Sequence, residues 1–387
     1  SEPAMMMNMG VLAANIPAPL IAVDEDDEFF LTLSNVGMIM RPDLFEQHTV
    51  HWHGYPNASS YFDGVPDASV AINIAGSFTY YYTAPDAGTY FWHCHITPPE
   101  HLQMGMVGQL YVRPRQNKVK AGGDLRKALA DTYKYVNSNG TNVAGADYDP
   151  CTVDVLCSSP LPATKNSTGG TIADATQVAG AHYAYNDGDA STRYDVEYPI
   201  QMHGFDPNFH FIGMTFNPEP FADMKDKYFL LNGRSYPDTV NPAVITTAAS
   251  DGVARAAQPL PALITIPHGG RALLRIADLS VTEYSTLATV GIPMNVIGFH
   301  ARMLRDMAGN NMSYQTNSIT LGGGESYDVI LDTCTGTRTA NYACVDATGA
   351  VAPFIPAGTY FLYSTNLDHL SNDAENFGGM MTEIVVQ

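Results

Sequence analysis

Three histidines lie within six positions of the segment QHTVHWHG: His48, His51 and His53. In a second segment, TYFWHCHI, Cys94 stands between His93 and His95. Imidazole and thiolate groups are the ligands that copper and zinc prefer in proteins. The spacing of these side chains therefore raises the question of how many metal sites they form.

Strand geometry divides these side chains into two groups. Successive side chains of an extended strand point to opposite faces, so Cys94 points away from both of its histidine neighbours. His48, three residues before His51, likewise points away from the other two histidines of its segment. Parity therefore predicts two sites on the two sides of one sheet: His48 with Cys94, and His51 and His53 with His93 and His95.

The first group is completed by the segment CHITPPEHLQMGM. It offers His101, seven residues after Cys94, and then Met104 and Met106. One thiolate, two imidazoles and a weak thioether form a blue-copper electron-transfer site. A structural zinc site is the alternative, and it is disfavoured because methionine is a poor zinc ligand.

The second group contains four imidazoles and suits copper or zinc. The alternative is four histidines satisfied within a core. Because Cys94 lies between His93 and His95, an electron at the first metal would reach the second site through a few covalent bonds. This connection favours an oxidase or a reductase over a metal store.

Composition narrows the class of protein. The chain has 387 residues, 45% of them hydrophobic, with 33 Gly, 25 Pro and 22 Tyr, which favours short strands joined by turns. Its net charge of −20 disfavours nucleic acid and anionic membranes and favours metal ions or a basic electron-carrier protein, unless it serves solubility alone. No apolar run approaches the roughly 20 residues of a membrane span.

Four of the five cysteines form two close pairs, which predicts two local disulfides: Cys151 with Cys157, and Cys334 with Cys344. Disulfides indicate an oxidising compartment. The chain starts at Ser1 without a charged or apolar leader, as expected for a mature exported protein. We therefore expect a periplasmic or extracellular location.

An internal repeat predicts two β-domains in tandem. The segment AGTYFWHCHI from Ala87 matches AGTYFLYSTN from Ala357, and each is followed by GM and a closing strand. The second copy has lost the metal-type side chains, since Tyr363, Ser364 and Thr365 replace them. We expect a first domain over residues 1–115 and a second domain over residues 195–387. Residues 116–194 between them are expected to form a linker or surface excursion with a helix at 124–136.

The segments HTVHWHG and HCHITPPEHLQMGM resemble the copper-binding repeat of multicopper oxidases, the laccase-like cupredoxin proteins. The resemblance implies an all-β fold of two tandem cupredoxin-like Greek-key β-sandwich domains, of which 1–115 binds copper and 195–387 lacks the type 1 site. It also implies a type 1 copper held by His48, Cys94 and His101, with Met106 axial. Type 2 and type 3 coppers are implied at the remaining histidines: His51 for type 2, and His53, His93 and His95 for the type 3 pair.

The chain departs from that family in two respects. The segment between Cys94 and His101 is longer than in laccases. A full trinuclear cluster needs eight histidines, and the second domain has no H-x-H pair. An alignment of NVIGFH with the first repeat sets His300 against His53. The second site is therefore complete, reduced to fewer coppers, or disabled.

The resemblance implies a multicopper oxidase that takes single electrons from a small-molecule, metal-ion or protein reductant near the surface at His101. The electrons pass through Cys94 to the histidine cluster, where dioxygen is reduced to water. Asp63 in YFDGVPD resembles an acid that delivers protons to the cluster, or it caps a turn. A ring of three chains is also implied.

Two other functions remain open. Copper nitrite reductases share the two-domain design, but they place a carboxylate where His51 stands and lack a counterpart of His95. A blue-copper electron-transfer or copper-handling protein would need only the first site.

Overall fold

The computed structural model describes residues 15–37, 46–55, 59–132, 135–136, 142–143, 163–165, 169–171, 175–213, 220–248 and 252–387. Strands dominate these residues and helices are few, so the all-β class expected from the sequence is confirmed. None of the described helices is long and apolar enough to cross a membrane.

Six strands in the first part of the chain form a four-stranded sheet, β1-β6-β5-β3, and a pair, β2-β4. Their bounds are β1 Ile21–Asp24, β2 Glu28–Ser34, β3 His51–His53, β4 Ser77–Thr83, β5 Gly88–His93 and β6 Val107–Arg113. Tyr80 and Tyr82 alternate with more exposed residues along β4 and pack in a core around Trp52. Side chains of β4 therefore alternate between the core and the surface, as in a half-buried strand.

The second part of the chain is a sandwich of a seven-stranded and a five-stranded sheet, whose apolar faces share one core cluster. The larger sheet contains β11 Val196–Phe205, β12 Tyr228–Leu231, β16 Arg271–Asp278, β18 Met294–Phe299, β19 Arg302–Met303, β20 Tyr314–Thr316 and β22 Ser326–Asp332. The smaller sheet contains β15 Ile264–Ile266, β17 Ser285–Val290, β21 Ser318–Leu321, β25 Gly358–Ser364 and β26 Met381–Val386.

Shorter elements connect or flank these sheets. The helices are α2 Pro98–Gln103, α3 Leu125–Thr132 and α4 Pro207–Gly213. The paired short strands are β7 Tyr135–Val136 with β8 Asn142–Val143, β9 His182–Tyr183 with β10 Arg193–Tyr194, β13 Ile245–Ala248 with β14 Ala254–Gln258, and β23 Thr337–Arg338 with β24 Cys344–Val345. Four short 3-10 helices, labelled η, are also present among the described residues: η2 Arg115–Lys118, η4 Phe221–Asp223, η5 Asp238–Val240 and η6 Leu367–Leu370.

Three expectations can be compared with these elements. The helix expected at 124–136 ends at Thr132, and Tyr135–Val136 pairs as a strand instead. The disulfide between Cys334 and Cys344 is present, whereas Cys151 and Cys157 lie outside the described residues. The divisions at residues 115 and 194 stay a prediction.

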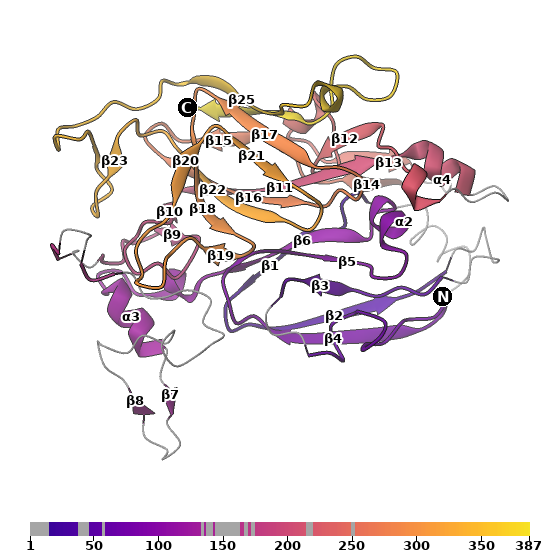
Figure 1. Cartoon of the computed structure of the whole chain (residues 1–387), viewed down its shortest axis with the longest axis horizontal. Helices are drawn as coiled ribbons and strands as arrows, with labels where there is room; N and C mark the ends of the chain where they lie inside the picture. The colour runs from indigo at the N-terminus through magenta and orange to yellow at the C-terminus, as the bar shows by residue number, and fades with distance from the viewer. Residues whose placement is uncertain are drawn as a thin grey trace.

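The first sheet packs beneath β11, β16 and β22 of the larger sandwich sheet (Figure 1). Polar side chains join the two layers. The Thr89 hydroxyl of β5 donates to Asp328 on β22 at 2.6 Å, and Gln109 of β6 donates to the Arg275 carbonyl at 2.7 Å. Because these groups are buried, their mutual hydrogen bonds fix how the layers sit on each other.

Arg275 is the centre of this buried network. Its side chain is fully buried, with Nε 3.1 Å from Glu197 and Nη1 3.7 Å from Asp328. The Tyr185 hydroxyl also donates to Asp328. A buried guanidinium is tolerated only while its carboxylate partners remain ionised beside it.

We predict that Asp328→Asn lowers the free energy of unfolding by about 3 kcal/mol, because it removes one counter-charge from the buried guanidinium. Chemical denaturation measures this loss. The matched control is Asp67→Asn, since Asp67 is exposed. Equal stabilities of the two variants would contradict the role of Arg275 and Asp328 in holding the layers together.

Candidate metal centre

The antiparallel pairing of β3 with β5 brings four imidazoles together. His51 lies directly opposite His93 in this pairing. The ring centroid of His51 lies 5.8 Å from that of His53, 5.2 Å from that of His93 and 5.1 Å from that of His95. The ligand atoms of His51, His53 and His93 all lie within 4.8 Å of one another, which leaves His95 at the edge of the group.

Cys94 follows the last residue of β5 and lies on the other side of the sheet with His48 and His101. Its Sγ lies 3.2 Å from Nδ1 of His101 and 3.8 Å from Nδ1 of His48. The Thr49 amide donates to the same sulfur at 3.5 Å. The two groups predicted from strand parity are thus the groups that lie together, and metal binding by them stays a prediction.

The segment after Cys94 forms α2, a helix that the sequence analysis missed. Pro98 and Pro99 occupy its first turn, where a missing amide hydrogen is tolerated. The helix turns His101 back toward Cys94. Met106 is tied to both residues through its backbone, since its amide donates to the His101 carbonyl at 2.9 Å and its carbonyl accepts from the Cys94 amide at 3.0 Å.

Glu46 completes the surroundings of the thiolate. Its carboxylate lies 2.7 Å from Nε2 of His101, so Nδ1 is the nitrogen of that ring that faces the sulfur. The His101 side chain is only 4% exposed. Because α2 and Glu46 enclose this ring, His101 is more buried than His48, which is half-buried. Electron entry near the surface at His101 stays a prediction.

The charges around Cys94 favour a thiolate. Burial raises the pKa of the thiol, but hydrogen bonds from His101 and His48 outweigh burial and lower the pKa to about 6. Burial lowers the pKa of His101. The hydrogen bonds with Cys94 and Glu46 have the larger, opposite effect, so the pKa is raised to about 9. The thiolate is thus formed near neutral pH, as a soft metal ion requires.

The imidazole cluster has the opposite character. Burial, reinforced by neighbouring histidines, lowers the pKa of His53 to about 4 and that of His93 to about 3. Both rings are therefore neutral at physiological pH, and Nδ1 of His53 lies 3.3 Å from Nε2 of His93, so the two rings share a hydrogen bond that a metal would replace. Nδ1 of His51 lies 2.7 Å from the Asp63 carbonyl and Nδ1 of His93 lies 2.8 Å from the Cys94 carbonyl, which directs Nε2 of each ring into the cluster.

Asp63 lies beside this cluster. Its carboxylate is 3.5 Å from Nδ1 of His51, and its side chain is 29% exposed. It therefore contacts both solvent and a ring of the cluster.

His300 lies in the second sandwich, at the end of β18. The alignment that set it against His53 is wrong. In the strand pairing, His53 stands opposite Phe91, and the corresponding residue of β17 is Val290, opposite Phe361. His300 is nevertheless close enough that its charge lowers the pKa of His53, and its Nε2 lies 3.7 Å from Glu325.

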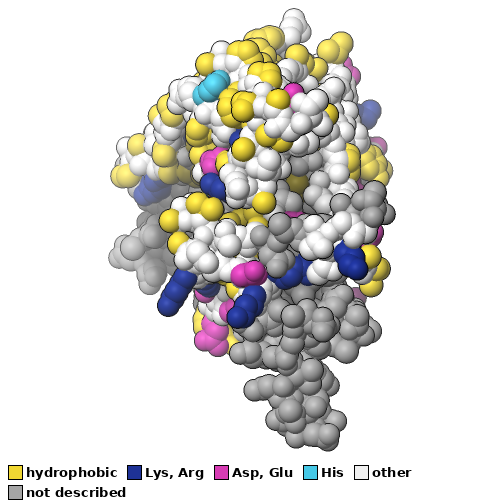
Figure 2. Space-filling model, turned by 90° about the vertical axis from the view of Figure 1, so that its left-hand side faces the viewer, with side chains coloured by type: hydrophobic (Ala, Val, Ile, Leu, Met, Phe, Trp, Pro, Cys, Tyr) yellow, Lys and Arg dark blue, Asp and Glu magenta, His cyan; other side chains and the backbone are white. Residues whose placement is uncertain are grey.

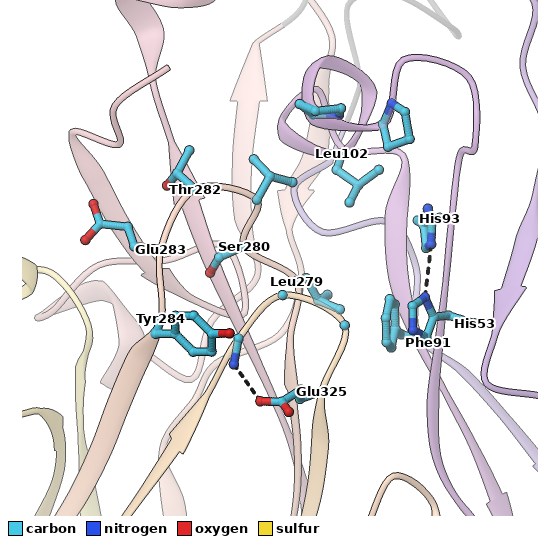
Figure 3. Close-up of a pocket in the computed structure, with 16 residues that line it drawn as sticks. His53, Phe91, His93, Leu102, Leu279, Ser280, Thr282, Glu283, Tyr284 and Glu325 are labelled. Carbon is cyan, nitrogen blue, oxygen red and sulfur yellow. Dashed lines mark hydrogen bonds between the residues drawn. The ribbon is translucent and has the colours of Figure 1, made fainter. Parts of the chain in front are cut away.

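A cavity of about 520 Å³ lies between the imidazole cluster and the second sandwich (Figure 3). His53, Phe91 and His93 line one side, and residues 279–284 and 322–325 line the other. Gly324 has φ +100°, and a Cβ there would lie 3.3 Å from the His53 ring. Glycine is thus required where this loop passes over the cluster.

The sequence analysis missed Glu46, Glu325 and the buried Asp278, because no motif marks them. Asp278 ends β16 next to the cavity wall and is fully buried. Its Oδ1 accepts from the Ser280 amide at 2.8 Å, while Oδ2 has no hydrogen-bond partner among the described residues. Burial raises its pKa from 3.8 to about 7.

With the fold and site described, comparisons with known proteins can be stated. Residues 3–117 match the family model described as multicopper oxidase. Multicopper oxidase MCE of Talaromyces pinophilus is 32% identical over 112 residues, which is 28% of this chain and 17% of that protein. Laccase abr2 of Aspergillus fumigatus is 29% identical over 140 residues, which is 35% of this chain and 22% of that protein.

Solved structures resemble nearly the whole chain. Blue copper oxidase from Nitrosomonas europaea aligns with a TM-score of 0.53 and 20% identity, over 96% of this chain and 76% of that one. Multicopper oxidase mgLAC aligns with a TM-score of 0.54 and 18% identity, over 95% and 76%. These similarities show the fold.

The fold and the two ligand groups define a protein built from cupredoxin-like β-domains. Its first part matches the multicopper oxidase family model, so the resemblance drawn from the histidine and cysteine motifs is confirmed. The chain spans only a minor part of the curated relatives named above.

We predict that Asp278 makes the protein less stable as pH rises from 5 to 8. Between its unfolded pKa of 3.8 and its folded pKa of about 7, the folded state binds the extra proton, so stability falls with rising pH. The slope is about 1.4 kcal/mol per pH unit below pH 7. Asp278→Asn should remove this part of the slope in denaturation experiments. Parallel pH profiles of the variant and the parent would contradict the prediction.

Proposed function

We propose that the protein is a copper-dependent oxidoreductase of the multicopper oxidase type, which transfers single electrons from a reductant to dioxygen. The position of Cys94 supports this most strongly. Its sulfur faces His48 and His101, while its chain neighbours, His93 and His95, belong to the imidazole cluster. A short run of covalent bonds thus joins the two groups.

The donor sets fit copper at both places. His48, Cys94 and His101, with Met106 beside them, would hold a type 1 copper, and the imidazole cluster would hold type 2 and type 3 coppers. Bound copper supplies the one-electron redox chemistry. The protein contributes a thiolate already formed near neutral pH, neutral imidazoles oriented by backbone carbonyls, and the Asp63 carboxylate, which can hold a proton beside His51.

The imidazole cluster is only half of a trinuclear site. All twelve histidines lie among the described residues, and beyond the thiolate site and the four clustered rings only His300 interacts with the cluster. We propose that further ligands come from other copies of the chain, in the ring of three that the resemblance implies. The disulfide between Cys334 and Cys344 supports a periplasmic or extracellular location.

The same histidine count favours a second candidate function, a blue-copper electron-transfer protein. In that case the thiolate site binds copper and the imidazole cluster does not turn over dioxygen. The two functions differ in copper content, in assembly and in the reaction with dioxygen.

We predict that Cys94→Ser abolishes the absorption near 600 nm of the copper-loaded protein, since that band requires a copper–thiolate bond. Copper at the imidazole cluster should remain, so the copper content measured by elemental analysis should fall by about one per chain. The matched control is Ser364→Ala, at the same position of the second repeat. A blue Cys94→Ser protein would refute the assignment.

We predict about four coppers per chain in a trimer that consumes dioxygen, because each complete site needs one type 1 copper and three clustered coppers. Light scattering, elemental analysis and oxygen consumption measure these quantities. A blue monomer with about one copper per chain and no oxygen consumption would instead establish the electron-transfer function.

A further inference from the structure

A second cavity, of about 450 Å³, lies between residues 189–193 and the second sandwich. Its lining elements β10 and β23 lie at the end of the molecule opposite α2 (Figure 1). Three arginines line the cavity, namely Arg193 of β10, Arg271 of β16 and Arg338 of β23. Figure 2 looks onto this end of the molecule, where Lys and Arg side chains are scattered among hydrophobic, acidic and neutral polar ones. Two carboxylates, Asp189 and Asp332, also line the cavity. Most of the other polar lining is amide and hydroxyl side chains: Asn295, Asn311, Ser313, Gln315, Thr337 and Thr339.

Tyr342 organises the arginines. The guanidinium of Arg193 lies 3.9 Å from the centre of its ring, and that of Arg338 lies 4.6 Å from it. The Tyr342 hydroxyl donates to Asp195 at 2.7 Å. Tyr342 also has φ +66°, a conformation that disfavours residues with a side chain. Such strain persists only where the surroundings hold the residue in place.

Two of the arginines already have partners. Arg338 donates to Asp332 at 2.7 Å and to the Gly269 carbonyl at 2.8 Å. Arg271 is only 5% exposed, and its Nε lies 3.1 Å from the same Asp332. Its two terminal nitrogens share a single acceptor, the Ser191 carbonyl, at 3.3 Å each. Hydrogen-bonding capacity is therefore left over at Arg271.

Arg193 has no such partner. Its Nε is buried without a hydrogen bond, and its guanidinium makes no hydrogen bond or ion pair with the residues that the structure describes. The nearby Asp189 is occupied by Arg305, at 2.6 Å. Arg193 is half-buried, and its buried Nε loses contact with water without gaining a hydrogen bond from the protein.

The local charge contrasts with the rest of the molecule. Four guanidinium groups (Arg193, Arg271, Arg305 and Arg338) face three carboxylates (Asp189, Asp195 and Asp332), which leaves one positive charge in a chain of net charge −20. The net negative charge of the chain repels anions in general. An anion that binds here must be held by the site itself.

We propose that this cavity binds a small oxyanion, a carboxylate or a phosphate, through the free fork of Arg193 and the unused donors of Arg271. Planar guanidinium groups pair with such oxyanions through two parallel hydrogen bonds. The amides and hydroxyls of the lining suit a ligand that also carries hydroxyl groups. The disulfide between Cys334 and Cys344 closes the loop that carries Arg338 and Tyr342, so the site is formed before the ligand arrives.

Isothermal titration calorimetry of the purified chain tests this site, with sodium phosphate and sodium malonate as separate probes at low salt. We expect one anion to bind per chain, and the stronger of the two probes identifies the ligand class. Arg193→Gln should weaken binding at least about tenfold, as expected for loss of a charge-assisted pair. Arg193→Lys keeps the positive charge but not the planar guanidinium, so its affinity should lie between those of the parent and Arg193→Gln.

The matched control is Arg302→Gln, since Arg302 is exposed on β19 and lies outside the cavity lining. It should bind like the parent. Circular dichroism and the thermal unfolding midpoint of each variant establish that it is folded. Absence of binding by both probes up to about 10 mM would overturn the proposal, as would equal affinities of the parent and Arg193→Gln.

Discussion

The pairing of β3 with β5 is the constraint on which both metal-type groups depend. It sets His51 opposite His93, and alternation along β5 then turns Cys94 toward the other side of the sheet. A shift of one residue in this pairing would exchange the faces of every side chain involved. The register is held by burial as well as by backbone hydrogen bonds, since Trp52 is 1% exposed and every residue of β5 is buried. The chemistry thus rests on a strand that the core fixes in place.

The second sandwich contributes the other wall of the site. It packs on β5 through the network of Thr89, Asp328 and Arg275, and this packing carries the loop with Gly324 over His53. The buried ionic groups of the interface are costly to desolvate and give little net stability, but they allow few alternative arrangements. The interface that joins the sheets therefore also determines the shape of the cavity beside the imidazole cluster.

Much of the site was predictable from the sequence because it depends on local geometry. Side-chain parity assigns six residues to two groups without knowledge of the fold. The position of His300 was not predictable in this way, because NVIGFH forms part of β18 in the larger sheet and not of β17, the counterpart of β3. Glu46 acts through a partner distant in the chain, His101, and Asp278 acts through its burial, and single carboxylates carry no sequence signal. The burial of His101 was also not predicted, because the helix α2, which begins with two prolines and places His101 in a buried position, was missed.

The second repeat shows how much of the thiolate site the backbone provides by itself. Ser364 replaces Cys94, yet its amide donates to the Met380 carbonyl at 2.9 Å and the Met380 amide donates to the His369 carbonyl at 2.8 Å, the same pair of bonds that ties Cys94, Met106 and His101. Glu283 lies 3.2 Å from Nε2 of His369, as Glu46 lies beside His101. This framework persists without a thiolate, so it does not need a metal to form. In the first repeat the strands and the closing loop therefore set the ligand positions, and a metal ion has to accept the geometry that the fold imposes.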